Sequence, residues 1–157
     1  MDELIESLKR SDALADQQAD TQNRIRLHNA GIIHAKAPDF WGLVDGQVRT
    51  LCQEMLEAFP HNVKRHLFPE TIPDGFMLNG GGLPKRILAA QLDINGERVR
   101  LSERIKQSIE DQPSPQPKSS INITVGPDDE LRFNFMGTPY ADPQSLARAF
   151  VTYVCGS

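Results

Sequence analysis

Apolar residues recur every three or four positions along residues 38–59, which is the spacing of one face of an α-helix. Pro38 suits the first turn of such a helix, and Pro60 marks its end. The pattern therefore predicts a helix over 38–59 with a broad buried side. The seam of this helix consists of Trp41, Val44, Val48, Leu51, Met55 and Ala58, at intervals of 3, 4, 3, 4 and 3 residues.

Residues 3–29 also predict a helix, but one with little to bury. Leu4, Ile5, Leu8, Ala15 and Ala19 share a face, whereas residues 16–23 are almost entirely polar. A break is expected between Gly31 and Pro38. Two arrangements fit this pattern. The first helix packs back along 38–59 as an antiparallel hairpin within one chain, or it lies across a second subunit of a homodimer.

The clearest local signal is a β-hairpin closed by Asn95-Gly96, a dipeptide typical of two-residue turns with positive φ at both positions. That turn fixes the register of the strands on either side. The register pairs apolar with apolar and acid with base: Leu92 with Val99, Ala90 with Leu101, Gln91 with Arg100, and Asp93 with Arg98. One face of this hairpin is therefore predicted to be buried and the other to be in water.

The rest of the chain adds a second hairpin, over 121–125 and 131–135, and a final helix that begins at Asp142 and Pro143. Between the hairpins, the spacing of Ile105 and Ile109 fits either a helical turn or a longer irregular edge; a short helix is favoured, and a Pro/Ser loop follows. The expected fold class is α+β, with N-terminal helices, a four- to five-stranded antiparallel sheet built from hairpins, and a C-terminal helix, in two layers. The expected domains are an N-terminal helical appendage over 1–37 and a globular domain over 38–157.

Charge and length narrow the function classes. The chain has 157 residues, with 17 basic and 21 acidic side chains and a net charge of −4, so it lacks the basic excess of a general nucleic-acid or membrane-surface binder. The one basic segment, 75–110, has a small excess that a solvated sheet face explains. No stretch approaches the roughly 20 apolar residues of a membrane span, and the acidic start does not resemble a signal peptide. A cytoplasmic protein is expected.

The sequence offers no motif for catalysis or metal binding. Cys52 and Cys155 do not form a CxxC pair and are expected to be reduced structural thiols. The four histidines lack the spacing of a helical zinc site, and the nucleophile motifs of hydrolases are missing. Asp93, paired with Arg98, would stay ionised and serve poorly as a general acid. No catalytic residue, metal or cofactor is therefore expected.

One glycine cluster suggests an alternative function. Gly80, Gly81 and Gly82 precede Lys85 and Arg86, and glycine amides can surround an anion while the two bases supply charge. The Walker spacing is missing, and a connection between two strands explains the glycines equally. The alternative is a small-ligand or anion-binding enzyme domain that uses residues 79–86.

The favoured function is a non-enzymatic protein-interaction or self-associating module, chaperone-like or adaptor-like, that acts as a homodimer or with a protein partner. Its expected interaction surface is Trp41, Val44, Val48, Leu51 and Met55. The order of elements, the acidic pI and the small size are similar to those of bacterial secretion chaperones, small α/β dimers that hold extended clients. The long N-terminal helix departs from that pattern.

Overall fold

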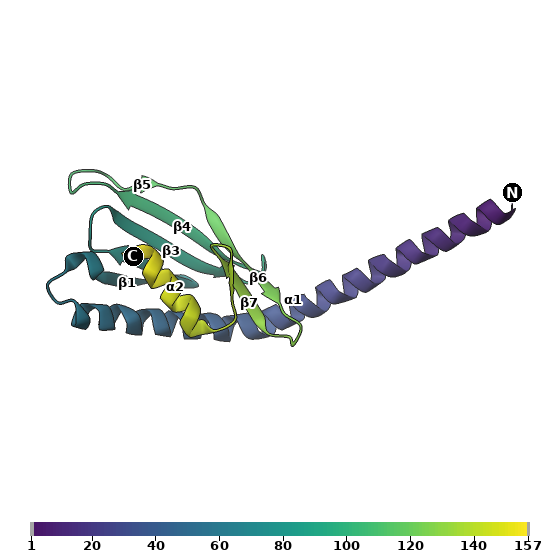
Figure 1. The fold of residues 1–157 in the computed structure, drawn as a ribbon, viewed down its shortest axis with the longest axis horizontal. Helices are drawn as coiled ribbons and strands as arrows, with labels where there is room; N and C mark the ends of the chain where they lie inside the picture. The colour runs from purple at the N-terminus through teal and green to yellow at the C-terminus, as the bar shows by residue number, and fades with distance from the viewer. Residues whose placement is uncertain (1, 157) are drawn as a thin grey trace.

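The computed structural model describes residues 2–156 and shows two helices and an antiparallel sheet (Figure 1). Helix α1 runs over Asp2–Ala58 and α2 over Pro143–Cys155, with a 3₁₀ turn, η1, at Val63–Arg65. The strands are β1 (Leu67–Ile72), β2 (Gly75–Gly80), β3 (Lys85–Asp93), β4 (Arg98–Lys106), β5 (Ser114–Pro115), β6 (Ser119–Val125), β7 (Leu131–Phe135) and β8 (Thr138–Tyr140). The ends of the two predicted domains, Met1 and Ser157, lie outside the described residues.

The α+β class and the antiparallel sheet are confirmed, but the sheet has eight strands instead of four or five. Its order is β1-β2-β3-β4-β6-β7-β8, and β5 pairs with β4. The additional strands β1, β5 and β8 give a weak sequence signal because all three contain proline and two are only two or three residues long. Short strands with proline give no clear alternation of apolar and polar residues.

The predicted register of the first hairpin is correct, with Leu92 opposite Val99 and Asp93 opposite Arg98. The turn itself differs from the prediction, because the positive φ, 54°, belongs to Glu97 instead of Asn95 and Gly96. The Gly96 N–H donates to Oδ1 of Asp93 at 3.1 Å, and this bond shapes a longer turn. Apolar pairing across the strands therefore sets the register without the expected two-residue turn.

The predicted helix at Ile105 is wrong. Strand β4 continues to Lys106, because its partner β3 is equally long and places Arg86 opposite Ile105. The second hairpin and the final helix are confirmed. Val125 pairs with Leu131, and the carboxylate of Asp142 accepts the N–H of Ser145 at 3.1 Å as the helix cap.

The predicted break before Pro38 is also wrong, since α1 is one continuous helix. Ile33, Ala37 and Trp41 lie one turn apart on the same side and are all buried. This packing on both sides of Pro38 outweighs the single backbone hydrogen bond that proline removes. The boundary expected between 37 and 38 thus falls inside a helix, and the antiparallel helix hairpin does not form.

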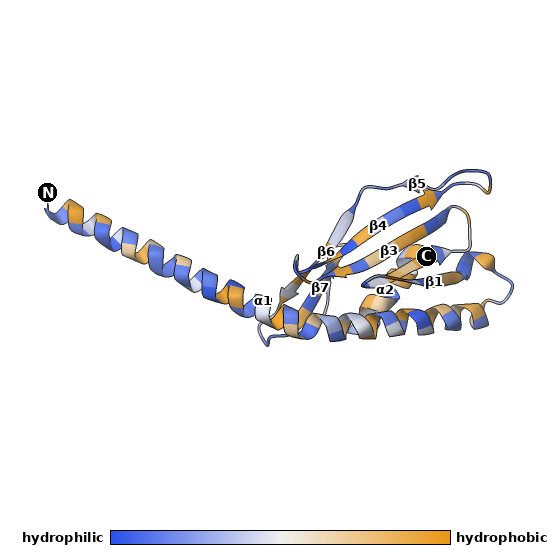
Figure 2. Cartoon of the chain, turned by 180° about the vertical axis from the view of Figure 1, so that it is seen from behind, coloured by the Kyte–Doolittle hydropathy of each residue, from blue (hydrophilic) through white to orange (hydrophobic). Residues whose placement is uncertain are grey.

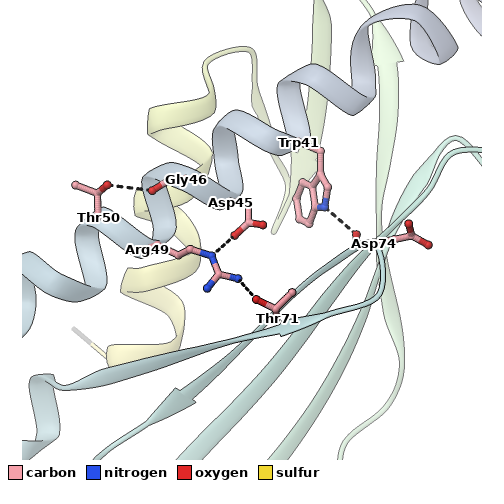
Figure 3. A network of polar contacts seen from close by, with 7 residues as sticks. All are labelled: Trp41, Asp45, Gly46, Arg49, Thr50, Thr71 and Asp74. Carbon is pink, nitrogen blue, oxygen red and sulfur yellow. Dashed lines mark hydrogen bonds and ion pairs between the residues drawn. The ribbon is translucent and has the colours of Figure 1, made fainter.

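Both helices pack on one face of the sheet and leave the other face uncovered (Figure 1). The centre of the core is aromatic. The ring of Trp41 stacks on Phe76 at 5.2 Å, and Phe150 of α2 meets Phe76 at 5.5 Å and Phe135 at 5.0 Å. Beside this cluster, Trp41 Nε1–H donates to the carbonyl of Asp74 at 2.9 Å (Figure 3). The indole therefore fixes α1 to the turn between β1 and β2.

A second polar contact joins α1 to β1. The guanidinium of Arg49 donates to Asp45 Oδ1 at 2.8 Å and to Thr71 Oγ1 at 2.9 Å (Figure 3). Asp45 lies one turn before Arg49, so it holds the guanidinium in position to reach the strand.

Val48 lies fully buried in the side of α1 that faces the sheet. We expect Val48→Glu to lower the free energy of unfolding by at least about 3 kcal/mol, because it buries an unpaired carboxylate. Leu43→Glu places the same side chain in the same helix at a position that is 61% exposed, and should change it by less than about 0.5 kcal/mol. Urea unfolding followed by circular dichroism measures both. Equal effects of the two substitutions would contradict the observed packing of α1.

Candidate functional site

The residues predicted as an interaction surface lie in the chain's own core. Trp41, Val44 and Val48 are at most 5% exposed, and Leu51 and Met55 are half-buried beside them. The sheet and α2 already cover this side of α1, so a partner cannot reach it in the folded chain. The helical pattern identified a buried seam correctly, but the partner of that seam is the sheet.

The glycine loop does not bring its five predicted anion-binding residues together. The N–H of Gly81 donates to the His66 carbonyl at 2.9 Å, and a Cβ at Gly81 would lie 2.5 Å from the Val63 carbonyl oxygen. Gly81 and Gly82 therefore allow the loop to pack against η1. Lys85 and Arg86 are consecutive in β3 and point to opposite faces of the sheet.

Arg86 instead belongs to a polar cluster between the sheet and α2. The hydroxyl of Tyr153 donates to Glu103 Oε2 at 2.6 Å, and Arg86 Nη1 lies 3.5 Å from Glu103 Oε1. The guanidinium carbon also stacks over the Tyr153 ring, 4.8 Å from its centre. At 3.5 Å the arginine neutralises the charge of Glu103 but leaves Oε1 without a hydrogen bond.

Burial is the main cause that raises the pKa of Tyr153 above its ordinary value, and the carboxylate of Glu103 adds to it. A cavity of about 220 Å³ lies beside the cluster, lined by both side chains and by Leu88, Leu101 and Phe135 among others. Ligand pockets usually measure about 300–1,000 Å³, so this space suits water or a very small molecule. The neutral hydroxyl of Tyr153 is bonded to Glu103, whose charge is paired with Arg86, and this contact mainly attaches α2 to β4.

Sequence reasoning missed this cluster although a signal was present. Val99, Leu101 and Glu103 occupy alternate positions of β4, so all three point to the helix-covered face. A carboxylate in such a series requires a polar partner, because a buried charge without one is costly. That partner, Tyr153, lies 50 residues away in the sequence and could not be identified from spacing alone.

The most unusual part of the molecule is the first half of α1. Residues 2–27, here called the arm, project beyond the sheet as a helix whose side chains are all exposed (Figure 1). Figure 2 shows hydrophobic residues recurring along the arm. The large ones are Leu4, Ile5, Leu8, Leu14, Ile25 and Leu27, each between 46% and 61% exposed.

The body of the molecule holds α1 just after the arm ends. His28 Nε2 lies 3.1 Å from Oδ1 of Asp129, and Lys36 Nζ donates to the Asp129 carbonyl at 2.9 Å. Asp129 lies in the turn between β6 and β7, with a φ of 59°. On the other side of this anchor, a hollow of about 420 Å³ lies between the arm and β6, lined by Ile25 and Ile123 among others. The contacts with Asp129 therefore fix the position at which the arm projects from the end of the sheet.

Within residues 2–156, no three histidine, cysteine or acidic side chains lie close enough to hold a metal ion. In the same range, no helix has the length and apolar content to cross a membrane.

The two cysteines differ in reactivity. Burial raises the pKa of Cys52 to about 11, whereas Cys155 is half-buried near the end of the chain. At pH 8 we expect Cys52 to react with a disulfide reagent about two orders of magnitude more slowly in the folded chain than in the unfolded chain, because the thiolate is the reactive form. A Cys155→Ser variant should show almost no reaction until it is unfolded. Rapid reaction of that variant in its native state would contradict the burial of Cys52.

The polar cluster gives a titration that can be measured. In a Tyr140→Phe background only Tyr153 titrates, since the chain has two tyrosines. We expect its absorbance at high pH to give a pKa above 10, and Glu103→Gln to lower that pKa by removing the negative charge. The raised pKa stabilises the fold fully below pH 10, and this contribution is lost as the pH rises through the pKa of the folded state. An unchanged pKa in Glu103→Gln would contradict the contact.

Comparison of the chain with protein-family models, with curated proteins and with solved structures finds no match.

Proposed function

We propose that this protein is a non-enzymatic, adaptor-like module that associates with itself through the arm. The observation that carries the proposal is the exposure of every side chain from residue 2 to residue 27 in a regular helix. A helix alone in water gains little from its backbone hydrogen bonds, and most helices in proteins are stabilised by packing of an apolar side. An arm without such packing is best explained by a partner that supplies it.

The apolar side of the arm supports the same conclusion. Leu4, Leu8, Ala15 and Ala19 follow at intervals of 4, 7 and 4 residues and so share one side of the helix. This side is continuous with the buried side further along α1, where Ile33 and the following core residues face the sheet. Full burial of a leucine or isoleucine contributes about 1.5–3 kcal/mol, so a few such residues suffice for a measurable association.

The geometry of the alternative site favours an interaction module over an anion-binding enzyme. Lys85 and Arg86 point to opposite faces of the sheet, and the Gly81 amide is already bonded to His66. The polar cluster of Arg86, Glu103 and Tyr153 joins α2 to the sheet. These contacts leave the arm as the element with the largest unused apolar surface.

The proposal is tested by light scattering on the full chain during size-exclusion chromatography. We expect the wild type to be a dimer at micromolar concentration, and Leu4→Asp/Leu8→Asp to be a monomer with unchanged thermal stability of the body. The control Ala13→Asp/Gln17→Asp adds the same charge on the opposite side of the arm and should remain a dimer. A wild type that stays monomeric at about 100 μM, or a dimer that tolerates Leu4→Asp/Leu8→Asp, would overturn the proposal.

A further inference from the structure

We infer that the arm of one copy lies across the uncovered face of the sheet in a second copy, and that the second arm does the same in return. This inference rests on the proposed self-association and adds the surface on which the arm binds. Three observations support it: the arm and the face have opposite charge, both carry apolar residues, and the arm points away from its own sheet.

The uncovered face of the sheet is strongly basic. Cross-strand pairing and the alternation along each strand place six basic side chains on it: Lys85, Arg98, Arg100, Arg104, Lys106 and Arg132. Two acidic side chains of the strands, Glu70 and Asp93, share this face, so the strands give it a net charge of +4. The sequence of this segment shows a smaller basic excess, because it also contains Glu97 and Glu103. Glu97 lies in the turn between β3 and β4, and Glu103 lies on the covered face.

Part of this positive charge has no acidic partner in the body. Asp93 is 3.3 Å from Arg98 and 3.6 Å from Arg100, and these contacts together with the Gly96 N–H lower the pKa of its carboxyl. Among residues 2–156, Arg104 and Lys106 form no ion pair. On the same sheet, a hollow of about 260 Å³ is lined by Arg98, Arg100 and Lys118 together with Ser119 and Ser120. The surface is therefore suited to carboxylates.

The arm has the complementary charge. Residues 2–27 contain six acidic and four basic side chains, a net charge of −2, and all six carboxylates lie in residues 2–20. Asp12 follows Leu8 by one turn and Asp16 follows Asp12 by another, so both carboxylates lie beside the apolar side of the helix. An arm placed with Leu8 against a basic surface would bring these carboxylates to it as well.

The uncovered face also offers apolar contacts. Phe68 of β1 is 47% exposed, and Met77 of β2 and Ala89 of β3, both half-buried, lie on the same face beside the basic side chains. A helix that carries leucine and alanine between aspartates matches such a mixed surface. The leucines would pack on the apolar part while the carboxylates reach the arginines and lysines.

The direction of the arm fits a two-fold arrangement. The side of α1 that carries Leu4 and Leu8 is the side that faces the chain's own sheet from Ile33 onward. Beyond the body, the arm projects away from the sheet into open space (Figure 1). A second copy, turned over by a two-fold axis beside the arm, places the uncovered face of its sheet in that space, and the same rotation returns its arm to the first copy.

Charge disfavours pairing of the two arms with one another. Two identical helices with a net charge of −2 over residues 2–27 repel each other, and the apolar side is interrupted by Gln22. The length of the arm suits the sheet instead, since 26 residues of helix extend about 39 Å. The basic sheet is therefore the better partner for the arm.

Charge exchange in the full chain tests the inference. One variant reverses the charge of two side chains in the arm, Asp12→Lys/Asp16→Lys. Another reverses the charge of two side chains on the uncovered face, Arg104→Glu/Lys106→Glu. We expect each variant alone to be a monomer by light scattering, with a Kd at least tenfold weaker than that of the wild type. An equimolar mixture of the two should form a 1:1 dimer, because the reversed positions of one copy's arm then meet reversed positions of opposite charge on the other copy's face, and the two unchanged surfaces meet each other as in the wild type. The control Arg148→Glu/Lys64→Glu alters basic residues of α2 and η1 and should remain a dimer.

The outcomes separate this inference from the proposed function. If the arm variants dissociate while Arg104→Glu/Lys106→Glu remains a dimer, the arm binds another surface, so the inference fails and the proposed function stands. A monomeric wild type overturns both. If the face-reversed variant loses binding to an oligo(dT) probe and keeps its dimer, the basic face serves nucleic acid and the inference fails. Circular dichroism of each variant confirms that it is folded.

Discussion

The side of α1 that packs on the sheet is the contact on which the rest of the structure depends. Trp41 stacks on Phe76, Phe150 of α2 reaches the same ring, and the Trp41 N–H is bonded to the Asp74 carbonyl. This contact aligns the helix with the sheet and, together with α2, covers the apolar face of the sheet. It also fixes where the helix leaves the body, and therefore where the arm points.

Two kinds of polar contact limit how the layers can slide. Arg49 joins α1 to β1, and Tyr153 with Glu103 joins α2 to β4. The Arg49 bond is exposed, whereas the Tyr153 bond is partly buried, so a shift of α2 would leave partly buried polar atoms without a partner. The glycine loop has a similar structural role, since Gly81 and Gly82 allow it to lie against η1.

The two helices cover one face of the sheet and leave the other uncovered, and the two faces carry different kinds of residue. The covered face is apolar apart from the cluster around Glu103, whereas the uncovered face carries the basic residues of β3 and β4. An acidic helical arm projects from the same chain. The proposed self-association would bring these two surfaces of opposite charge together between copies, since the continuous helix α1 carries the arm away from the sheet of its own copy.

The sequence by itself determined the elements whose evidence is local: the register of the first hairpin, the second hairpin, the cap at Asp142 and the buried seam of α1. Only the tertiary structure decided that α1 is continuous through Pro38, that the seam faces the sheet, and that Glu103 meets Tyr153. The physical reason is the same in each case. Periodicity shows which side of an element is apolar, but the residue that covers that side is distant in the sequence and is chosen by packing.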